Sequence, residues 1–212
     1  MGGDDPYSLL PKALGDAVTY PADAVIGRAR SMLGRPIAYV LGCGGRNPGA
    51  ATPETTRTFP GGTKRTGSDC IGFVAWCSGF DRFNESFPLY GGWINTDSSL
   101  GVWNGTRWNP IDRFFRLVTT PVAGCWVVYP SIDLDHDGKR DRIGHVGIVS
   151  DVSGWESRKW DGIKVIHCSA VAYRKTGSAI IETAGTIWGR ASSYRGHQSA
   201  RWGAAFLVPQ VP

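Results

Sequence analysis

Five short segments rich in β-branched and aromatic residues follow residue 120, and they constrain the fold more than any other feature of the sequence. Turn residues separate the segments, which span 124–129, 145–149, 163–167, 179–182 and 204–208. Segments of this length and composition are typical of strands. We therefore predict a β-sheet in the part of the chain beyond residue 120.

Two helices are predicted before these strands. The first begins at Pro21, which suits a first helical turn, and runs for about three turns of apolar residues at helical spacing. The second begins at Cys70, behind a Ser68 or Asp69 cap, and stops near Gly79. Helices followed by strands indicate an α+β class in which the helices pack on an antiparallel sheet.

The other segments are expected to be loops or an arm. Residues 1–20 are rich in Gly, Pro and Asp and form an N-terminal arm, whereas 21–212 form one domain, because a chain of 212 residues supports one sizeable core. Residues 42–67 form a polar loop, and 81–120 a long loop with one short helix at 111–117.

Composition excludes several classes of protein. No apolar run approaches the roughly 18 residues of a membrane span, and five cysteines without a CxxC pair do not suggest a disulfide scaffold. The opening residues are acidic where a secretion signal would be basic, so we expect synthesis in the cytoplasm without a signal peptide. Lys and Arg outnumber Asp and Glu by 23 to 18, which suits an anionic polymer such as a bacterial wall or nucleic acid.

Cys70 is the candidate nucleophile. A thiol in the first turn of a helix lies where free N–H groups favour negative charge, which stabilises the thiolate. The same N–H groups can point at a tetrahedral oxyanion. The plainer interpretation is an inert core residue, because Phe73 and Val74 fall on the same helix face. The other four cysteines, at 43, 77, 125 and 168, have only this second interpretation.

A cysteine nucleophile needs a histidine nearby in space, and the sequence has four, at positions 136, 145, 167 and 197. His145 opens one predicted strand and His167 ends the next, so neighbouring antiparallel strands could place them side by side. His145 would then be the base and His167 the residue that orients it. His197 is an alternative for the third position, and strand-end histidines are also common as surface groups.

Five pieces of sequence occur in the order found in one known family. SMLGRPIAYVLGCGG, SDCIGFVAW, PVAGCWVVYP, GHVGIV and VIHCSA, spread over 31–170, together resemble the NlpC-type cell-wall cysteine peptidases, which are related to the CHAP amidases and to papain-like enzymes. Segments 42–67 and 81–120 depart from the family, and we expect them to shape substrate choice.

The resemblance implies a papain-like NlpC-type fold and a role for each matching residue. Cys70 would be the nucleophile, His145 the general base and His167 the third polar residue. Tyr39, which precedes the paired glycines, would lie near the oxyanion. Asp69 would be structural.

Residues 133–141 read DLDHDGKRD and follow the start of an EF-hand-type calcium loop, with Gly138 at the sharp turn. The position of the bidentate glutamate is occupied by Gly144. Two interpretations stay open, namely an acidic turn and a structural Ca²⁺ site that rigidifies the loop before His145. The carboxylates concerned are Asp133, Asp135, Asp137 and Asp141.

The sequence also has nine tryptophans, many for its length. Trp76 and Trp126 lie in apolar runs and are expected in the core. Five others lie in polar segments of the sequence. For these we expect the rings to pack long loops rather than to stack on a sugar: Trp93, Trp103, Trp108, Trp155 and Trp160.

The leading hypothesis is a monomeric peptidoglycan hydrolase that does not act on nucleic acid and needs no cofactor for its chemistry. Cys70 would attack an amide of the stem peptide or of the sugar–peptide junction, and His145 would protonate the leaving amine. Such a protein would reach the wall after release, as a phage endolysin does, or after export as an effector. The alternatives are a non-catalytic wall- or glycan-binding module of the same fold and an acyltransferase.

Overall fold

The structure is a computed structural model that describes residues 21–87, 89–100, 102–103, 106–107, 114–131, 143–156, 159–193 and 204–209, with the backbone alone for 102–103, 106–107 and 191–193. Its centre is a six-stranded sheet in the order β5-β10-β6-β7-β8-β9, and all neighbouring strands are antiparallel. The strands are Phe115–Val118 (β5), Trp126–Tyr129 (β6), His145–Asp151 (β7), Lys164–Cys168 (β8), Ile180–Ala184 (β9) and Ala205–Pro209 (β10). The predicted α+β class with an antiparallel sheet is confirmed.

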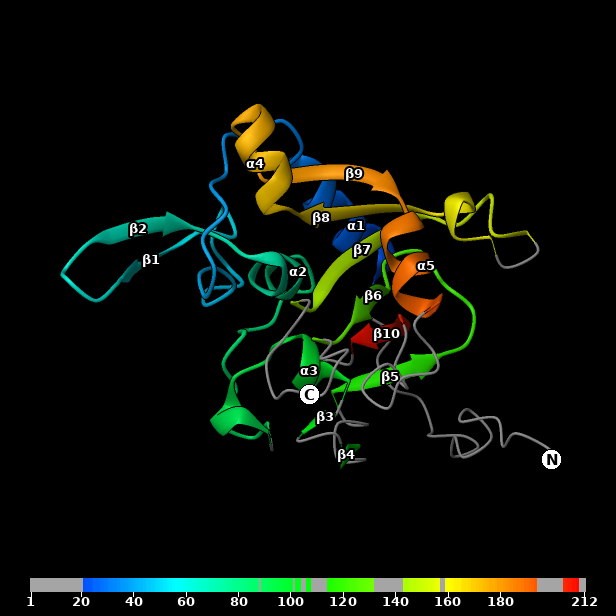
Figure 1. Ribbon diagram of the computed structural model, residues 1–212, viewed down its shortest axis with the longest axis horizontal. Coiled ribbons are helices and arrows are strands. Elements are labelled where there is room, and N and C mark those ends of the chain that lie inside the picture. The colour runs from blue at the N-terminus through cyan, green and yellow to red at the C-terminus, as the bar shows by residue number, and fades with distance from the viewer. Residues whose placement is uncertain are drawn as a thin grey trace.

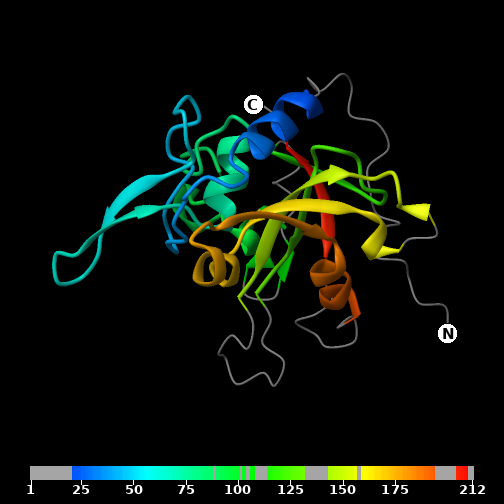
Figure 2. The same cartoon turned by 90° about the horizontal axis from the view of Figure 1, so that it is seen from above.

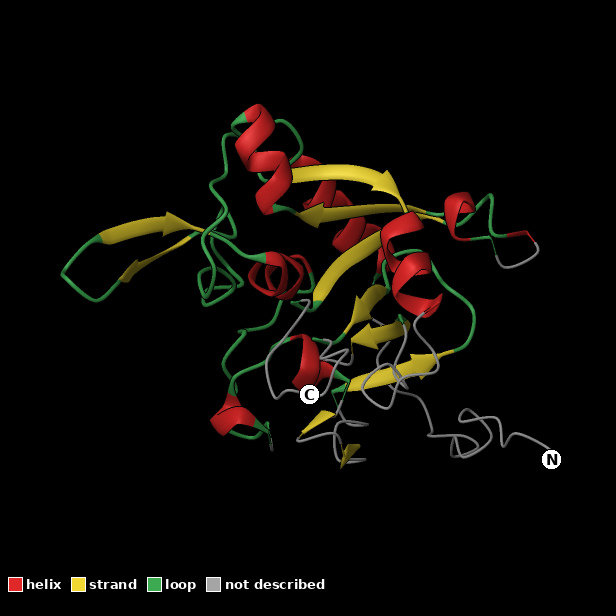
Figure 3. Cartoon of the chain, in the orientation of Figure 1, coloured by secondary structure: helices red, strands yellow, loops and turns green. Residues whose placement is uncertain are grey.

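Helices surround this sheet, as Figure 1 and Figure 3 show. The α-helices are Ala22–Ser31 (α1), Cys70–Cys77 (α2), Thr96–Ser99 (α3), Ala170–Thr176 (α4) and Thr186–Ser193 (α5). Two 3-10 turns, Tyr90–Gly92 (η1) and Trp160–Gly162 (η4), and two small hairpins, Thr55–Thr58 with Lys64–Gly67 (β1, β2) and Val102–Trp103 with Thr106–Arg107 (β3, β4), complete the described elements. The two predicted early helices are confirmed as α1 and α2.

The sheet has a separate apolar cluster on each face. On one face, α1 and α2 pack against Val146, Ile148 and Ile166, and every residue of α2 is buried. On the other face, Trp188 of α5 packs with Val149 and neighbouring strand residues. Figure 2 shows α1 and α5 on opposite sides of the sheet. This arrangement places the first turn of α2 against β7.

The segment 42–67 contains a hairpin where a loop was predicted. β1 and β2 pair from Thr55 opposite Gly67 to Thr58 opposite Lys64, and the hairpin projects from the body of the molecule (Figure 1). Six of its eight strand residues are exposed. The sequence does not signal these strands because both of their faces are polar, so no apolar alternation appears.

Two other predictions differ from the structure. The helix predicted at 111–117 is wrong at its C-terminal end, because Phe115 starts strand β5 and its ring is buried. The sequence predicts helices only before residue 120, so α4 and α5 were not predicted. Ser169 caps α4, and Gly177 ends it in the left-handed conformation at φ 76°. The predicted arm, 1–20, lies outside the described residues.

No helix within the described ranges is long and apolar enough to cross a bilayer. All five cysteines are free and buried, in agreement with the prediction that the chain is not a disulfide scaffold. Trp76 and Trp126 lie in the core as predicted.

Gly72 fixes how closely α2 approaches the preceding loop. A Cβ at this position would lie 2.4 Å from the carbonyl oxygen of Cys43 and 2.7 Å from the Cα of Gly44, and both are backbone atoms. Gly27 in α1 has no atom within 4 Å of an added Cβ. The two glycines therefore allow a matched comparison of one substitution in a tight and in an open environment.

We predict that Gly72→Ala lowers the free energy of unfolding by about 2 kcal/mol or more, because backbone must move. Gly27→Ala should raise it by about 0.5–1 kcal/mol through helix propensity. Urea denaturation measures both changes. Equal effects of the two substitutions would contradict the close packing of α2 on the loop.

Candidate active site

The first turn of α2 presents Cys70 behind the side chain of Asp69. Oδ1 of Asp69 accepts a hydrogen bond from the N–H of Gly72 at 2.8 Å, as an N-cap does. Oδ2 of the same carboxylate accepts from the N–H of Gly42 at 2.8 Å. The structure therefore selects Asp69 from the two predicted caps and ties the helix start to the loop after Tyr39.

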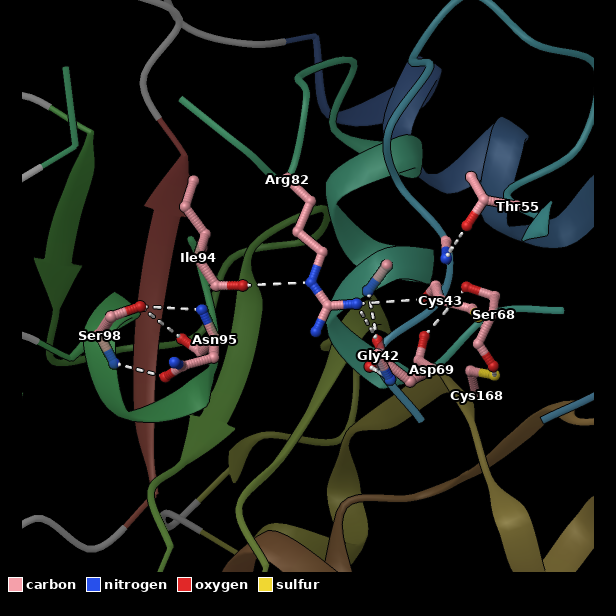
Figure 4. A network of polar contacts seen from close by, with 12 residues as sticks. Gly42, Cys43, Thr55, Ser68, Asp69, Arg82, Ile94, Asn95, Ser98 and Cys168 are labelled. Atoms are coloured by element: carbon pink, nitrogen blue, oxygen red, sulfur yellow. Dashed lines mark hydrogen bonds and ion pairs between the residues drawn. The ribbon is translucent and has the colours of Figure 1, made fainter. Parts of the chain in front are cut away.

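Arg82 completes the surroundings of this carboxylate (Figure 4). Its Nη1 lies 2.9 Å from Oδ1 of Asp69, and the two side chains are only 5% and 2% exposed. The guanidinium also donates to the carbonyl oxygens of Cys43 at 3.1 Å and Ile94 at 3.3 Å. A buried ion pair with additional hydrogen bonds is the arrangement in which both charges are satisfied.

Cys70 is buried against the start of β7, with 6% of its surface exposed. The N–H groups of Val146 and Ile71 face its sulfur and favour the anion, as does Arg82. Burial and the charge of Asp69 outweigh them and raise the pKa of the thiol to about 12. This outcome differs from the expected stabilisation of a thiolate, because desolvation of the charged sulfur exceeds what one short helix supplies.

The two predicted histidines lie side by side. Nε2 of His145 is 2.8 Å from Nδ1 of His167, and Nε2 of His167 is 3.2 Å from Oγ1 of Thr183 on β9. Gly147 makes room for this pair, because a Cβ there would lie 3.0 Å from the Cβ of His167. A continuous chain of three polar side chains therefore crosses strands β7, β8 and β9.

Trp188 covers this pair on the α5 side of the sheet. Its ring stacks on His145 with centroids 5.5 Å apart and meets His167 edge-on at 5.2 Å. Burial lowers the pKa of His145, and burial together with the neighbouring His145 lowers the pKa of His167. Both imidazoles are therefore neutral at neutral pH.

At the start of β7, Cys70 and the ring of His145 lie on different sides of the sheet. Val146 points to the α2 side of the sheet, whereas His145 points to Trp188. The sulfur of Cys70 faces the N–H of Val146, the residue that follows His145. No direct hydrogen bond between Cys70 and His145 occurs among the contacts of the described residues. The structure thus brings the two histidines into contact with each other and Cys70 only to the backbone of the residue after His145.

Tyr39 lies close to the nucleophile candidate. Its backbone bridges to Ser68, two residues before Cys70, and its side chain packs against the core that contains α2. Burial, followed by the charges of Cys70 and Asp69, raises the pKa of the Tyr39 hydroxyl. The hydroxyl is thus a hydrogen-bond donor at every physiological pH.

Several predicted features lie outside the described residues. These are the acidic loop with Asp133, Asp135, Asp137 and Asp141, together with His136 and His197. Within the described part of the chain, no cluster of His, Cys, Asp and Glu is arranged to hold a metal ion. The calcium site stays a prediction.

The loop tryptophans divide into two groups. Trp155 and Trp160 pack on Phe206, with ring centroids 5.6 Å and 5.3 Å from it, which agrees with the expected packing role. Trp93 is partly exposed and lies against the guanidinium of Arg82, 4.6 Å from its ring centre. The side chains of Trp103 and Trp108 are not among those described.

Comparisons with protein-family models, curated proteins and solved structures found no match for this chain. The interpretation of the site therefore rests on its own geometry and on the sequence pieces described above.

Sequence reasoning missed Arg82, Thr183 and Trp188. Tertiary packing brings each of them to the site from another element or loop, so neither spacing nor periodicity marks it. Thr183 has the clearest signal, because the β8–β9 register pairs Val165 with Thr183 and thus places it diagonally across from His167.

We predict that Arg82→Met lowers the free energy of unfolding by about 3–5 kcal/mol, because it leaves the carboxylate of Asp69 buried without a counter-charge. In an Asp69→Asn background, the same substitution should lower the free energy of unfolding by less, because no charge is left unpaired. A double-mutant cycle by urea denaturation measures this coupling.

The control is Arg46→Met. Arg46 pairs with Asp81 at 2.9 Å, but these side chains are 47% and 37% exposed, so the cost should stay below about 1 kcal/mol. A coupling near zero for Asp69 and Arg82 would show that the buried pair does not hold the helix start.

Proposed function

We propose that this protein is a peptidoglycan hydrolase of the NlpC type, with a papain-like arrangement of Cys70, His145 and His167. It would cleave an amide bond of the stem peptide or of the sugar–peptide junction, and it would act on the bacterial wall after release or export. The support comes from the sequence pieces in family order and from the contacts around Cys70.

One observation carries the proposal, namely the His145–His167–Thr183 chain at the point where β7 begins. The next residue of that strand, Val146, directs its N–H at the sulfur of Cys70. A nucleophile, a base and a residue that orients the base are the minimum for cysteine-based acyl transfer. Histidines with a merely structural role would not require a cysteine at the adjoining helix start.

The mechanism begins from a neutral thiol and a neutral imidazole. When Nε2 of His145 donates a hydrogen bond to Nδ1 of His167, Nδ1 of His145 carries the lone pair. The mechanism requires that the His145 ring turn toward the sulfur of Cys70, where Nδ1 would accept the thiol proton. His167 in turn stabilises the imidazolium that forms. His145 then returns the proton to the leaving amine, and water hydrolyses the thioester.

The tetrahedral oxyanion needs donors on the nucleophile side of the carbonyl. The first turn of α2 has N–H groups that Asp69 does not cap, and the Tyr39 hydroxyl keeps its proton because burial raises its pKa. These groups are suited to the developing negative charge. The proposed role of Tyr39 is therefore to donate a hydrogen bond to the oxyanion and not to transfer a proton.

We predict that purified wall incubated with the parent protein releases new amino groups, and that Cys70→Ala lowers this rate by at least about 10³-fold. Cys125→Ala is the control, because Cys125 is equally buried but belongs to the cluster on the opposite face of the sheet. Its rate should stay near that of the parent.

Two results would favour the alternatives. Equal sedimentation of parent and Cys70→Ala with wall, without amine release by either, would indicate a binding module. Capture of the acyl group by an added amine in preference to water would indicate an acyltransferase.

We predict a pH profile that reflects the buried histidines. Activity requires neutral His145, whose pKa is lowered by burial, so kcat/KM should fall with acid only well below about pH 6.5, the ordinary histidine pKa. Trp188→Phe admits water to the ring, relieves desolvation and should move this acid limb upward. Hydrolysis of a soluble stem peptide across pH measures both. An acid limb at the ordinary histidine pKa in the parent would contradict the assignment.

A further inference from the structure

A cleft of about 610 Å³ lies beside the helix start and has no role in the chemistry described above. Its lining residues are Gly42, Arg46, Thr55, Thr56, Arg57 and Trp93. They come from the loop and hairpin within 42–67 and from the segment around η1, the two regions in which the sequence departs from the family. This volume is in the range of small-molecule and peptide subsites.

Arg57 gives the cleft a positive charge. Its side chain is exposed on β1, and it has no acidic partner among the ion pairs of the described residues. Its guanidinium occupies the space that a side chain at Gly42 would fill. Gly42 stands at φ 79°, a conformation that also favours glycine.

Arg46 supplies a second guanidinium to the lining of the cleft. Its Nε is paired with Asp81 at 2.9 Å, and its guanidinium lies 5.7 Å from the ring centre of Trp93. The pairing uses Nε and holds the side chain in place, which leaves the terminal nitrogens as donors. Trp93 provides the only large apolar surface among the lining residues.

The hairpin places like charges directly opposite each other. Arg57 pairs in register with Arg65, and both guanidiniums lie over the ring of Phe59, at 5.2 Å and 5.6 Å from its centre. Opposed like charges destabilise a hairpin, and the ring of Phe59 offsets only part of that repulsion. An anionic ligand would offset the repulsion.

The cleft is connected to the nucleophile through Gly42. This residue lines the cleft and donates its N–H to Oδ2 of Asp69, which immediately precedes Cys70. Figure 4 shows Gly42, Thr55 and Asp69 grouped around the same loop. A peptide with an anionic group in the cleft would therefore extend toward the helix start.

We propose that this cleft is a substrate subsite that binds a carboxylate group of the peptide between Arg46 and Arg57, with Trp93 in contact with the adjacent methylene groups. Planar guanidiniums match a carboxylate through paired hydrogen bonds. The proposal names the substrate class for the proposed function and rests on it: a peptide whose carboxylates are free rather than amidated.

The test compares a synthetic stem peptide with free carboxylates and the same peptide with its carboxylates converted to primary amides. Binding is measured calorimetrically at constant ionic strength on Cys70→Ala, so that it does not depend on hydrolysis. We expect the free acid to bind about tenfold or more tightly than the amide, and Arg57→Gln to remove that preference. In the catalytically intact protein, the same substitution should raise KM for the free acid and leave kcat near the parent value.

Arg65→Gln is the matched control, because Arg65 faces Arg57 across the hairpin and contacts the same Phe59 but does not line the cleft. It should leave the preference intact. Equal binding of acid and amide, absence of binding of either, or equal effects of Arg57→Gln and Arg65→Gln would overturn the subsite. Binding with this Arg57 dependence but without hydrolysis would keep the subsite and refute the enzyme.

Discussion

The buried carboxylate of Asp69 is the interaction on which the rest of the site depends. It accepts hydrogen bonds from Gly72 in the helix, from Gly42 in the preceding loop and from Arg82 beyond the helix. Removal of any one donor would leave the Asp69 carboxylate with one hydrogen bond fewer at a site that water does not reach. Three chain segments are therefore held in one geometry, and Cys70 takes its position from that geometry.

The same burial that fixes Cys70 also opposes its ionisation. Burial and the neighbouring carboxylate of Asp69 raise the pKa of Cys70, so its resting form is a neutral thiol. Burial lowers the pKa values of His145 and His167, so both rest as neutral imidazoles. Under the proposed function, charge separation would therefore accompany attack on the carbonyl, with the oxyanion and the imidazolium of His145 forming together. Under the proposed function, the Cys70 thiol would react poorly with general alkylating reagents and selectively with a bound acyl group.

The sequence determines the elements more clearly than the contacts between them. The strands around β7 and β8 and the helix at Cys70 were predictable because apolar periodicity, β-branched residues and an acidic cap all act locally. Even the contact of His145 with His167 followed from their positions at strand ends. The β1–β2 hairpin was not predictable, because its Thr, Arg and Lys residues give neither strand an apolar face. The contacts of Trp188 and Arg82 were not predictable either, because they arise from tertiary packing between elements.

The position of the cleft relative to the Asp69 carboxylate links substrate choice to nucleophile geometry. Gly42 lines the cleft next to the guanidinium of Arg57, and it donates its N–H to the carboxylate of Asp69. The loop that contains Gly42 follows Tyr39, which the proposed function makes a donor to the oxyanion. A carboxylate in the proposed subsite would thus hold the peptide beside this loop, and binding energy obtained away from the scissile bond would lower KM rather than raise kcat.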